Sequence, residues 1–496
     1  MAFMEKVRIE RDYISRLEQT ETIFDMAAVC YEILNEELDN QTMFVSKYLD
    51  TYNGKEKNVK NNPNISLLTQ FSDEISALLQ DYPKSTFEKK KQIILNKMQQ
   101  IELWGFEKRK ENMLTIVFTL LSAIDSAVPL WKVIEMEDRQ ALNKGNSQKR
   151  YFVYPVGRGM DEDLIYAIGR ERRANAGIDE NLTNLIILDR SRLPKNAGQP
   201  KLNYLSRKAG GKIIRVAIIA GMDGGHFTTL PLSGSSEGIT YIEEKQEQVG
   251  NLICRQMHAA IEKGAEFIIL PEFCGSEEIL KIIRTKLKEW KQDGTMHSKL
   301  IAVFPGSTWI RDNDNVQYLL DACGRDIGQH YKNAPFRKRK EGVGYEITEA
   351  LTHPGLRSTL LYIKNLGYVL PATCRDVIDG TYTDYYVEKF TPTLLMVPAW
   401  SSSGGSFEKP LKRYSADYFT NSVFCNGCGA LRRNSTIIGG ASVIGRKKTT
   451  AAGVYLAIKK RENCTNPCGN MCTYMLNIGL SRENTGTEGR ITYQLV

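Results

Sequence analysis

One segment of the sequence reads GYVLPATCRD, from Gly367 to Asp376. It begins with an apolar run that has the composition of a β-strand, and it ends in a cysteine followed by a charged pair. A cysteine at a strand end can face a cleft, whereas most free cysteines are small, buried apolar side chains. Cys374 is therefore a candidate nucleophile, and the alternative for it is a buried thiol.

Two ionisable residues precede Cys374 in the chain and strengthen this interpretation. Glu272 follows the apolar run in IILPEF, from Ile268 to Phe273, and Lys332 lies in HYKN, from His330 to Asn333. Glu272 could instead be an ordinary carboxylate at a helix start, and the basic region around Lys332 is by default a solvated loop. Taken together, the three residues predict a site that hydrolyses carbon–nitrogen bonds without a cofactor.

Length and composition are those of a large globular protein. The chain has 496 residues, of which 42% are hydrophobic and 25% are charged, and its formal net charge is +8. These values allow two or three domains, argue against wholesale disorder and permit an acidic partner without requiring one. We see no signal peptide, and the longest apolar run, 113–128, is too short for a membrane span. Since the ten cysteines suit free thiols, we expect a cytoplasmic protein without membrane contact.

The hydrophobic periodicity changes along the chain. Residues 1–142 carry apolar stripes with helical spacing, such as the one from Ile23 to Leu38, and predict a mainly helical N-terminal domain. The pattern weakens over residues 143–211, a mixed connecting segment with two short apolar runs that could be strands. Strands and helices alternate over residues 212–496, which predicts an α/β domain.

The second part of the chain resembles the nitrilase, or carbon–nitrogen hydrolase, superfamily. Four landmarks follow one another in the order and at the spacing of that family: Leu270-Pro271-Glu272-Phe273, Tyr331-Lys332, Cys374-Arg375-Asp376 and Met396-Val397-Pro398-Ala399. Each fragment alone is weak, and the ordered set carries the resemblance over residues 212 to 485. It implies an αββα sandwich, here preceded by the helical N-terminal domain, and a homodimer or larger homo-oligomer.

The resemblance also implies a Glu-Lys-Cys triad that acts on a small amide or carbamoyl compound, and less often on a nitrile. The residue types suit this chemistry. Glu272 can take the thiol proton and later activate water, and Lys332 can stabilise the oxyanion. Cys374 would form a thioester, and the backbone N–H of Arg375 would be the second oxyanion donor. No metal and no cofactor are required.

The family usually has a second glutamate shortly after the lysine. Glu341, Glu346 and Glu349 compete for this role, and we favour Glu346 because a tyrosine and an isoleucine flank it. The segment from Phe336 to Gly344 is unusually basic for a substrate loop. This departure favours a negatively charged substrate or partner, such as a phosphate-bearing amide.

Two alternatives concern the site itself. Five cysteines could supply a structural zinc site. They are Cys425, Cys428, Cys464, Cys468 and Cys472. The first pair falls on an expected core strand, so we predict no metal. His330 lies two residues before Lys332, and a pair of His330 with Cys374 stays formally possible, although the Glu-Lys-Cys pattern accounts for more residues.

The second class of function is a nucleic-acid-associated effector. The N-terminal region interleaves basic and aromatic residues: Lys89, Lys90, Lys91, Lys97, Trp104, Phe106, Lys108, Arg109 and Lys110. Such mixing can follow a phosphate backbone, whereas a solvated helix face over a buried stripe is the simpler explanation. By analogy with antiviral-defence proteins that contain nitrilase-like domains, the fold would then be a partner-gated enzyme or an assembly module.

Overall fold

The computed structural model describes two compact units. The described residues are 12–52, 63–80, 87–101, 109–127, 150–156, 177–194, 200–205 and 213–496, the last range without 223, 233–235, 295–298, 311–312, 340–345, 432–434, 448–449, 461–471 and 481–490. The first unit comprises Met1–Val156 and Ile165–Arg192, and the second comprises Gly157–Leu164 and Leu193–Val496.

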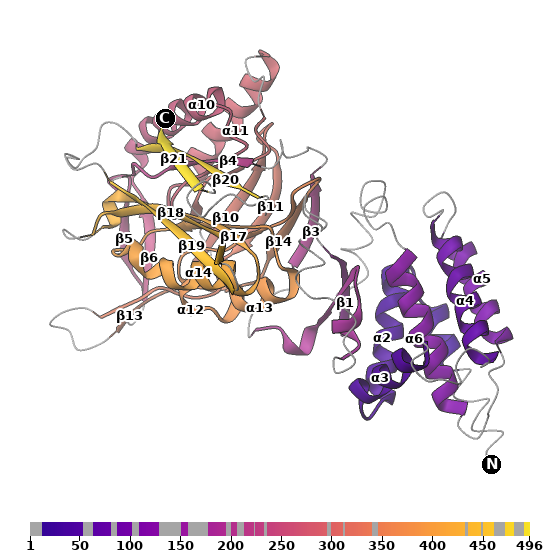
Figure 1. Cartoon of the computed structure of the whole chain (residues 1–496). Helices are drawn as coiled ribbons and strands as arrows, with labels where there is room; N and C mark the ends of the chain where they lie inside the picture. Colours follow the sequence, from indigo (N-terminus) through magenta and orange to yellow (C-terminus); the bar gives the residue numbers. More distant parts are fainter. Residues whose placement is uncertain are drawn as a thin grey trace. The chain divides into compact units, whose positions relative to one another are not determined.

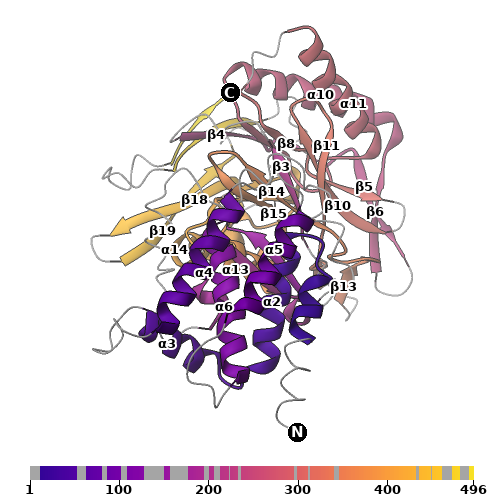
Figure 2. The ribbon, with the colours of Figure 1, turned by 90° about the vertical axis from the view of Figure 1, so that its right-hand side faces the viewer.

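The first unit is mainly helical, as the periodicity predicts (Figures 1 and 2). Its described elements are α2 (Ile23–Glu37), α3 (Gln41–Tyr52), α4 (Pro63–Gln80), α5 (Phe87–Gln100), α6 (Arg109–Ala127) and the antiparallel pair of β1 (Tyr151–Pro155) and β2 (Leu185–Asp189). Thr22 caps α2 by accepting the N–H of Asp25 at 3.1 Å, which satisfies one of the free donors at a helix start.

Two polar side chains attach the paired strands to the helices. Asn35 of α2 donates to the hydroxyl of Tyr151 at 2.7 Å. Asp125 of α6 accepts the backbone N–H groups of Thr183, Asn184 and Leu185 at 2.8, 2.7 and 2.9 Å. The segment 143–211 is therefore divided: β1 and β2 belong to the helical unit, whereas β3 joins the second unit.

The described strands of the second unit form three sheets. The first has the order β11-β10-β8-β7-β4-β20-β21, with β9 paired to β10. Its strands are β4 (Ile213–Ile219), β7 (Phe267–Ile269), β8 (Ala302–Phe304), β9 (Ser307–Ile310), β10 (Asp314–Asp321), β11 (Asp326–Tyr331), β20 (Thr473–Gly479) and β21 (Ile491–Leu495).

The second sheet has the order β19-β18-β17-β16-β15-β14-β3, and a smaller third sheet has the order β12-β13-β6-β5. The strands of the second sheet are β3 (Pro200–Leu205), β14 (Ser358–Ile363), β15 (Gly367–Pro371), β16 (Leu394–Ala399), β17 (Asn421–Asn426), β18 (Ile437–Lys447) and β19 (Thr450–Lys459). Those of the third are β5 (Phe227–Pro231), β6 (Ser236–Tyr241), β12 (Arg337–Arg339) and β13 (Glu346–Glu349).

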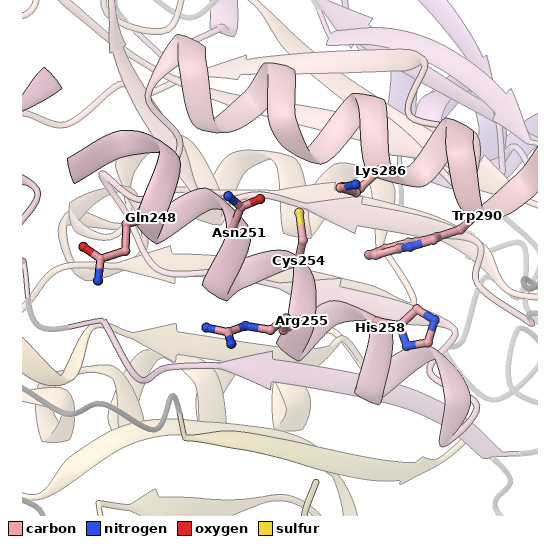
Figure 3. Close-up of a pocket in the computed structure, with 7 residues that line it drawn as sticks. All are labelled: Gln248, Asn251, Cys254, Arg255, His258, Lys286 and Trp290. Atoms are coloured by element: carbon pink, nitrogen blue, oxygen red, sulfur yellow. The ribbon is translucent and has the colours of Figure 1, made fainter. Parts of the chain in front are cut away.

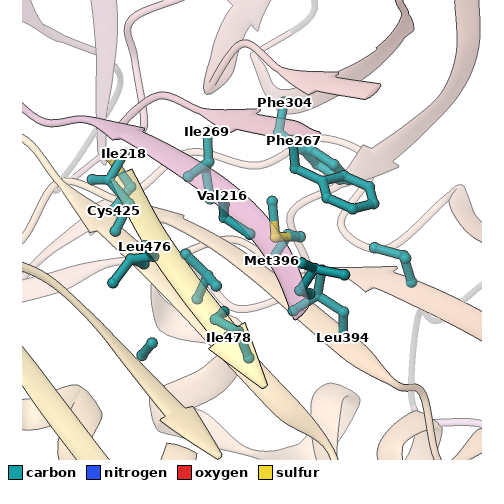
Figure 4. Packing of buried hydrophobic residues seen from close by; sticks show 14 of the residues in the cluster. Val216, Ile218, Phe267, Ile269, Phe304, Leu394, Met396, Cys425, Leu476 and Ile478 are labelled. Carbon is teal, nitrogen blue, oxygen red and sulfur yellow. The ribbon is translucent and has the colours of Figure 1, made fainter. Parts of the chain in front are cut away.

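One apolar core joins the two larger sheets (Figure 4). Val216 and Ile218 of β4 meet Leu394 and Met396 of β16 in this cluster, and all four side chains are fully buried. Burying a side chain of this size stabilises the fold by about 1.5–3 kcal/mol. Because β16 runs through the interior with every residue buried, it reads as a continuous apolar run rather than an alternating one. β4 is continuously buried only from Val216 onward, after the exposed Arg215.

Helices cover the outer faces of both sheets. α10 (Glu243–Glu262) and α11 (Glu277–Gln292) pack on the first sheet, and Ile253, Met257 and Ile283 share a second apolar cluster with strand residues there. On the second sheet, α14 (Glu408–Asp417) contacts β17, β18 and β19. The unit is thus a mixed α/β domain, as predicted. Within the described residues no helix is both long and apolar enough to cross a bilayer.

Gly306 provides a test of this packing, because a side chain there would overlap the carbonyl oxygen of Pro271. Its φ is +77°, so Gly306→Ala adds backbone strain to a steric clash and should lower the free energy of unfolding by about 3 kcal/mol. Gly294 is a matched control: its φ is +68° and an added Cβ meets nothing within 4 Å. Gly294→Ala should cost only about 1 kcal/mol. Equal losses of unfolding free energy in the two variants, measured by urea denaturation, would contradict the clash.

Candidate active site

The three predicted residues stand where strands end. Glu272 follows β7 after two residues, Lys332 directly follows β11, and Cys374 lies between β15 and α12 (Arg375–Asp379). β7 and β11 belong to the first sheet and β15 to the second. Because the backbone leaves the sheet at these points, polar side chains there can converge without interrupting the core.

Lys332 lies between two carboxylates. Its Nζ donates to Oε1 of Glu272 at 2.7 Å and to Oε2 of Glu349 at 2.6 Å. The side chains of Lys332 and Glu272 are each 1% exposed. Removed from water, charges of this kind must be paired and hydrogen-bonded to be tolerated.

Glu349, the last residue of β13, is the glutamate that contacts Lys332, whereas the sequence favoured Glu346. Glu349 also accepts the N–H of Phe336 at 2.7 Å. Of the three candidates, Glu349 is the one that the structure shows beside the lysine. Glu341 and the side chain of Glu346 lie outside what the structure describes.

Asn315 of β10 is a site residue that the sequence analysis missed. Its Nδ2 donates to Oε1 of Glu272 at 2.8 Å and to Oε1 of Glu349 at 2.9 Å. Asn315 is 1% exposed, and a buried polar residue within a strand is the one available signal. This signal does not predict what Asn315 does, because the partners of Asn315 lie on other strands.

Cys374 has a strained backbone. Its φ is 47° and its ψ is −102°, a region that a residue with a side chain rarely adopts. Such strain persists only where the surrounding structure fixes it, and it is concentrated at functional sites. The N–H of Cys374 donates to the carbonyl of Pro398 at 2.9 Å. Arg375 is the first residue of α12, so its N–H has no acceptor within that helix.

The thiol and the carboxylate of Glu272 affect each other. Burial raises the pKa of Cys374 well above its usual value, the charge of Glu272 raises it further, and Lys332 and the N–H of Trp400 oppose this. Burial also raises the pKa of Glu272, against the charge of Lys332. The N–H of Trp400 donates to Oε2 of Glu272 at 2.9 Å. The thiol therefore keeps its proton beside a carboxylate that can accept it.

Lys332 remains a cation. Burial alone would favour its neutral amine, but the charges of Glu272 and Glu349 outweigh burial and raise the pKa of Lys332. A fixed positive charge beside the thiol can stabilise negative charge that develops on a substrate oxygen.

Asp376 connects the turn at Cys374 to the turn that follows Lys332. Its Oδ1 accepts the N–H groups of Asn333 and Ala334 at 2.9 and 2.7 Å, and its Oδ2 accepts the N–H of Thr373 at 3.1 Å. Asp376 is fully buried. The carboxylate thus fixes the two turns relative to each other.

His330 takes part in this connection and not in a Cys–His pair. Its Nε2 lies 2.9 Å from Oδ2 of Asp376. Its Nδ1 lies 3.2 Å from the hydroxyl of Ser358 and 3.3 Å from that of Tyr382. Both ring nitrogens are therefore engaged, and neither is left for Cys374.

Three cysteines of the zinc alternative lie within the described residues. Cys425 and Cys472 are buried in the core between the two larger sheets, and Cys428 packs against it. In the described part of the chain no group of three or more histidine, cysteine or acidic side chains could hold a metal ion. Cys464 and Cys468 fall outside the described residues.

Two lysines of the basic N-terminal region point inward. Lys90 and Lys91 of α5 are 3% and 5% exposed. Lys90 donates to the carbonyl of Leu78, and Lys91 donates to the carbonyls of Glu18 and Thr20 at 2.7 and 2.9 Å. These two ammonium groups join helices and are not available to a phosphate backbone. Trp104, Phe106 and Lys108 of the predicted surface lie outside the described residues.

A groove of about 670 Å³ opens between α10 and α11 (Figure 3). It is lined by Gln248, Asn251, Cys254, Arg255, His258, Lys286 and Trp290. Burial raises the pKa of Cys254 to about 12, which makes this thiol a poor nucleophile. Lys286 is paired with Glu289 at 2.8 Å. Because the thiol of the groove is not activated, whereas Cys374 interacts with Glu272 and Lys332, we place the candidate active site at Cys374.

Comparison with known proteins gives matches among solved structures. No protein-family model matches the chain, and no curated protein matches it. The amidase from Nesterenkonia sp. aligns with 50% of this chain and 90% of its own, at 16% identity and a TM-score of 0.32. Nit3 of Saccharomyces cerevisiae, a member of branch 10 of the nitrilase superfamily, aligns with 58% of this chain and 92% of its own, at 14% identity and a TM-score of 0.31.

The C. elegans NitFhit protein gives a similar match, with 51% of this chain and 61% of that chain aligned, 13% identity and a TM-score of 0.31. All three matches are of low identity and low TM-score. We therefore base the functional proposal on the geometry of the site.

The connection through Asp376 can be tested by removing its charge. In Asp376→Asn an amide N–H₂ must face backbone N–H groups that now donate to a carboxylate, so we expect the free energy of unfolding to fall by about 3 kcal/mol. Asp379→Asn, an exposed change on the same helix, should alter it by less than about 0.5 kcal/mol. Urea denaturation of both variants measures the difference. If the free energy of unfolding is unchanged in Asp376→Asn, the two turns are held by other contacts.

Proposed function

We propose that the second unit is a thiol-dependent hydrolase of non-peptide carbon–nitrogen bonds, acting on a small amide or carbamoyl compound, and that it has the αββα sandwich of the nitrilase superfamily. The observation that carries this proposal is the convergence of Glu272, Lys332 and Cys374. A base, a cation and a thiol on three different strand ends meet in one cluster, and a purely structural role does not require this combination.

In the first half of the proposed reaction, Cys374 attacks the acyl carbon of the substrate. Glu272 accepts the thiol proton as the carbon–sulfur bond forms. The carbonyl π electrons move to the oxygen, where the charge of Lys332 and the N–H of Arg375 stabilise it. When the tetrahedral intermediate collapses, the carbon–nitrogen bond breaks and the leaving nitrogen takes the proton from Glu272. Ammonia or an amine departs and a thioester remains.

In the second half, water hydrolyses the thioester. Glu272 takes a proton from the water as its oxygen attacks the acyl carbon, and the same two donors stabilise the second oxyanion. The carbon–sulfur bond then breaks, and the sulfur of Cys374 regains the proton from Glu272. The acid product leaves, and the enzyme returns to its starting state without a change of oxidation level.

The surroundings of the site favour a small, negatively charged substrate. Cys374 is 4% exposed, which suits a small acyl group. Phe336, whose N–H donates to Glu349, is followed by Arg337 on β12, and both are exposed. This start of the basic segment is therefore tied directly to the site, where a cation can pair with an anionic group on the substrate.

The central test is a panel of amides, carbamoyl compounds and nitriles, assayed for release of ammonia with Cys374→Ala beside the unmodified protein. We expect Cys374→Ala to reduce release at least about a thousandfold, because the covalent route is lost. Cys254→Ala is the matched control, since Cys254 is also a buried thiol but lies in the outer groove. It should keep the activity. Activity that persists in Cys374→Ala would refute the mechanism.

The pH dependence tests the base. Because the pKa of Glu272 is raised by burial and by the charge of Glu349, its base form is lost on acidification at a higher pH than for an exposed glutamate, which titrates near about 4.3. The acidic limb of kcat/KM should therefore lie above that value. Glu349→Gln removes one negative neighbour and should move the limb to lower pH. A limb that moves upward in this variant would contradict the assignment of Glu272.

A further inference from the structure

Asn315 makes the contacts that join the acidic groups of the site. Besides the two bonds from its Nδ2 to Glu272 and Glu349, at 2.8 and 2.9 Å, its backbone carbonyl accepts the N–H of Lys332 at 2.9 Å. One residue of β10 therefore contacts both carboxylates and the backbone N–H of Lys332. Each bond fixes one partner relative to the same short segment of strand.

The charges explain why such a residue is needed. Glu272 and Glu349 share a single ammonium group, Lys332, so two like charges lie close together where the surroundings are poor in water. A second cation at position 315 would bind both carboxylates but would compete with Lys332 for them. The amide of Asn315 donates to both without changing the charge of the site.

The orientation of the amide supports this role. Oδ1 of Asn315 is buried and has no hydrogen-bond partner among the described residues, an arrangement that costs about 1–3 kcal/mol. The opposite orientation would place this oxygen against two carboxylates, which also only accept hydrogen bonds. The side chain is therefore held by its two donated bonds, each to a charged acceptor and stronger than a neutral one.

We propose that Asn315 is a positioning residue that holds Glu272 in its ionised, proton-accepting form by donating hydrogen bonds to both carboxylates. This inference rests on the proposed function of Glu272 as the base for Cys374. In this role Asn315 acts through Glu272 and not on the reacting atoms. A hydrogen bond to the charged form of an acid favours that form, so the loss of the amide makes Glu272 hold its proton to higher pH.

The test measures how fast iodoacetamide alkylates Cys374 at different pH values, with the Cys374 peptide quantified by mass spectrometry. The reaction needs the thiol proton to pass to Glu272, so its rate should rise through the titration of that carboxyl. Asn315→Ala removes both donors, and Asn315→Asp replaces them with a third acidic group. We expect the midpoint to rise by about one pH unit in Asn315→Ala and by more in Asn315→Asp.

Asn421→Asp is the matched control. Asn421 is also a buried strand asparagine, 5% exposed, and its Nδ2 donates to the carbonyl of Thr393 at 3.0 Å. The same substitution there should lower stability without moving the alkylation midpoint. An equal shift in the control would reduce Asn315 to a structural role, and unshifted midpoints in both Asn315 variants would overturn the inference.

The kinetic experiment separates this inference from the proposed function. If the unmodified protein releases ammonia from a substrate of the panel, Asn315→Ala should lower kcat by about a hundredfold with KM changed less than about threefold. A rise in KM with unchanged kcat would contradict a positioning role. If the unmodified protein is inactive on the panel, the proposed function fails, while the alkylation midpoints still decide the role of Asn315.

Discussion

The ammonium group of Lys332, buried between the carboxylates of Glu272 and Glu349, is the contact on which the arrangement of the site depends. It attaches three chain segments to one another, because each partner comes from a different strand end. Removing one partner of a buried ion pair costs about 3–5 kcal/mol, since the remaining charge is left without compensation. The lysine therefore acts in the stability of the domain as well as in its proposed chemistry.

Around this ion cluster the backbone is fixed by polar contacts rather than by apolar packing. Cys374 has a positive φ at the turn that carries the thiol, and the carboxylate of Asp376 holds the neighbouring turns. Gly306 allows the chain to pass directly over Pro271, next to Glu272. The two sheets supply a rigid support, and the turns at their ends supply the geometry that a reaction needs.

The basic residues of the helical unit are compatible with two roles, binding to nucleic acid and internal hydrogen bonding. Its basic residues resemble a surface for nucleic acid, yet Lys90 and Lys91 direct their ammonium groups to backbone carbonyls inside the unit. A lysine stem packs with apolar side chains while its charged end finds acceptors. Whether those acceptors are phosphates or carbonyls depends on how the helices pack, which a list of residues does not contain.

The sequence by itself determined the helical first part, the mixed α/β second part and the positions of Glu272 and Cys374 at the ends of apolar runs. This was possible because hydrophobic periodicity and the residues that end strands are local properties of a sequence. The sequence singled out Lys332 as a candidate but put no strand before it. Only the tertiary structure decided that Glu349 contacts Lys332, that Asn315 joins both carboxylates, and that His330 turns to Asp376. These contacts depend on which faces of β10, β11 and β13 meet when distant strands pair, and that is set by packing across the whole domain.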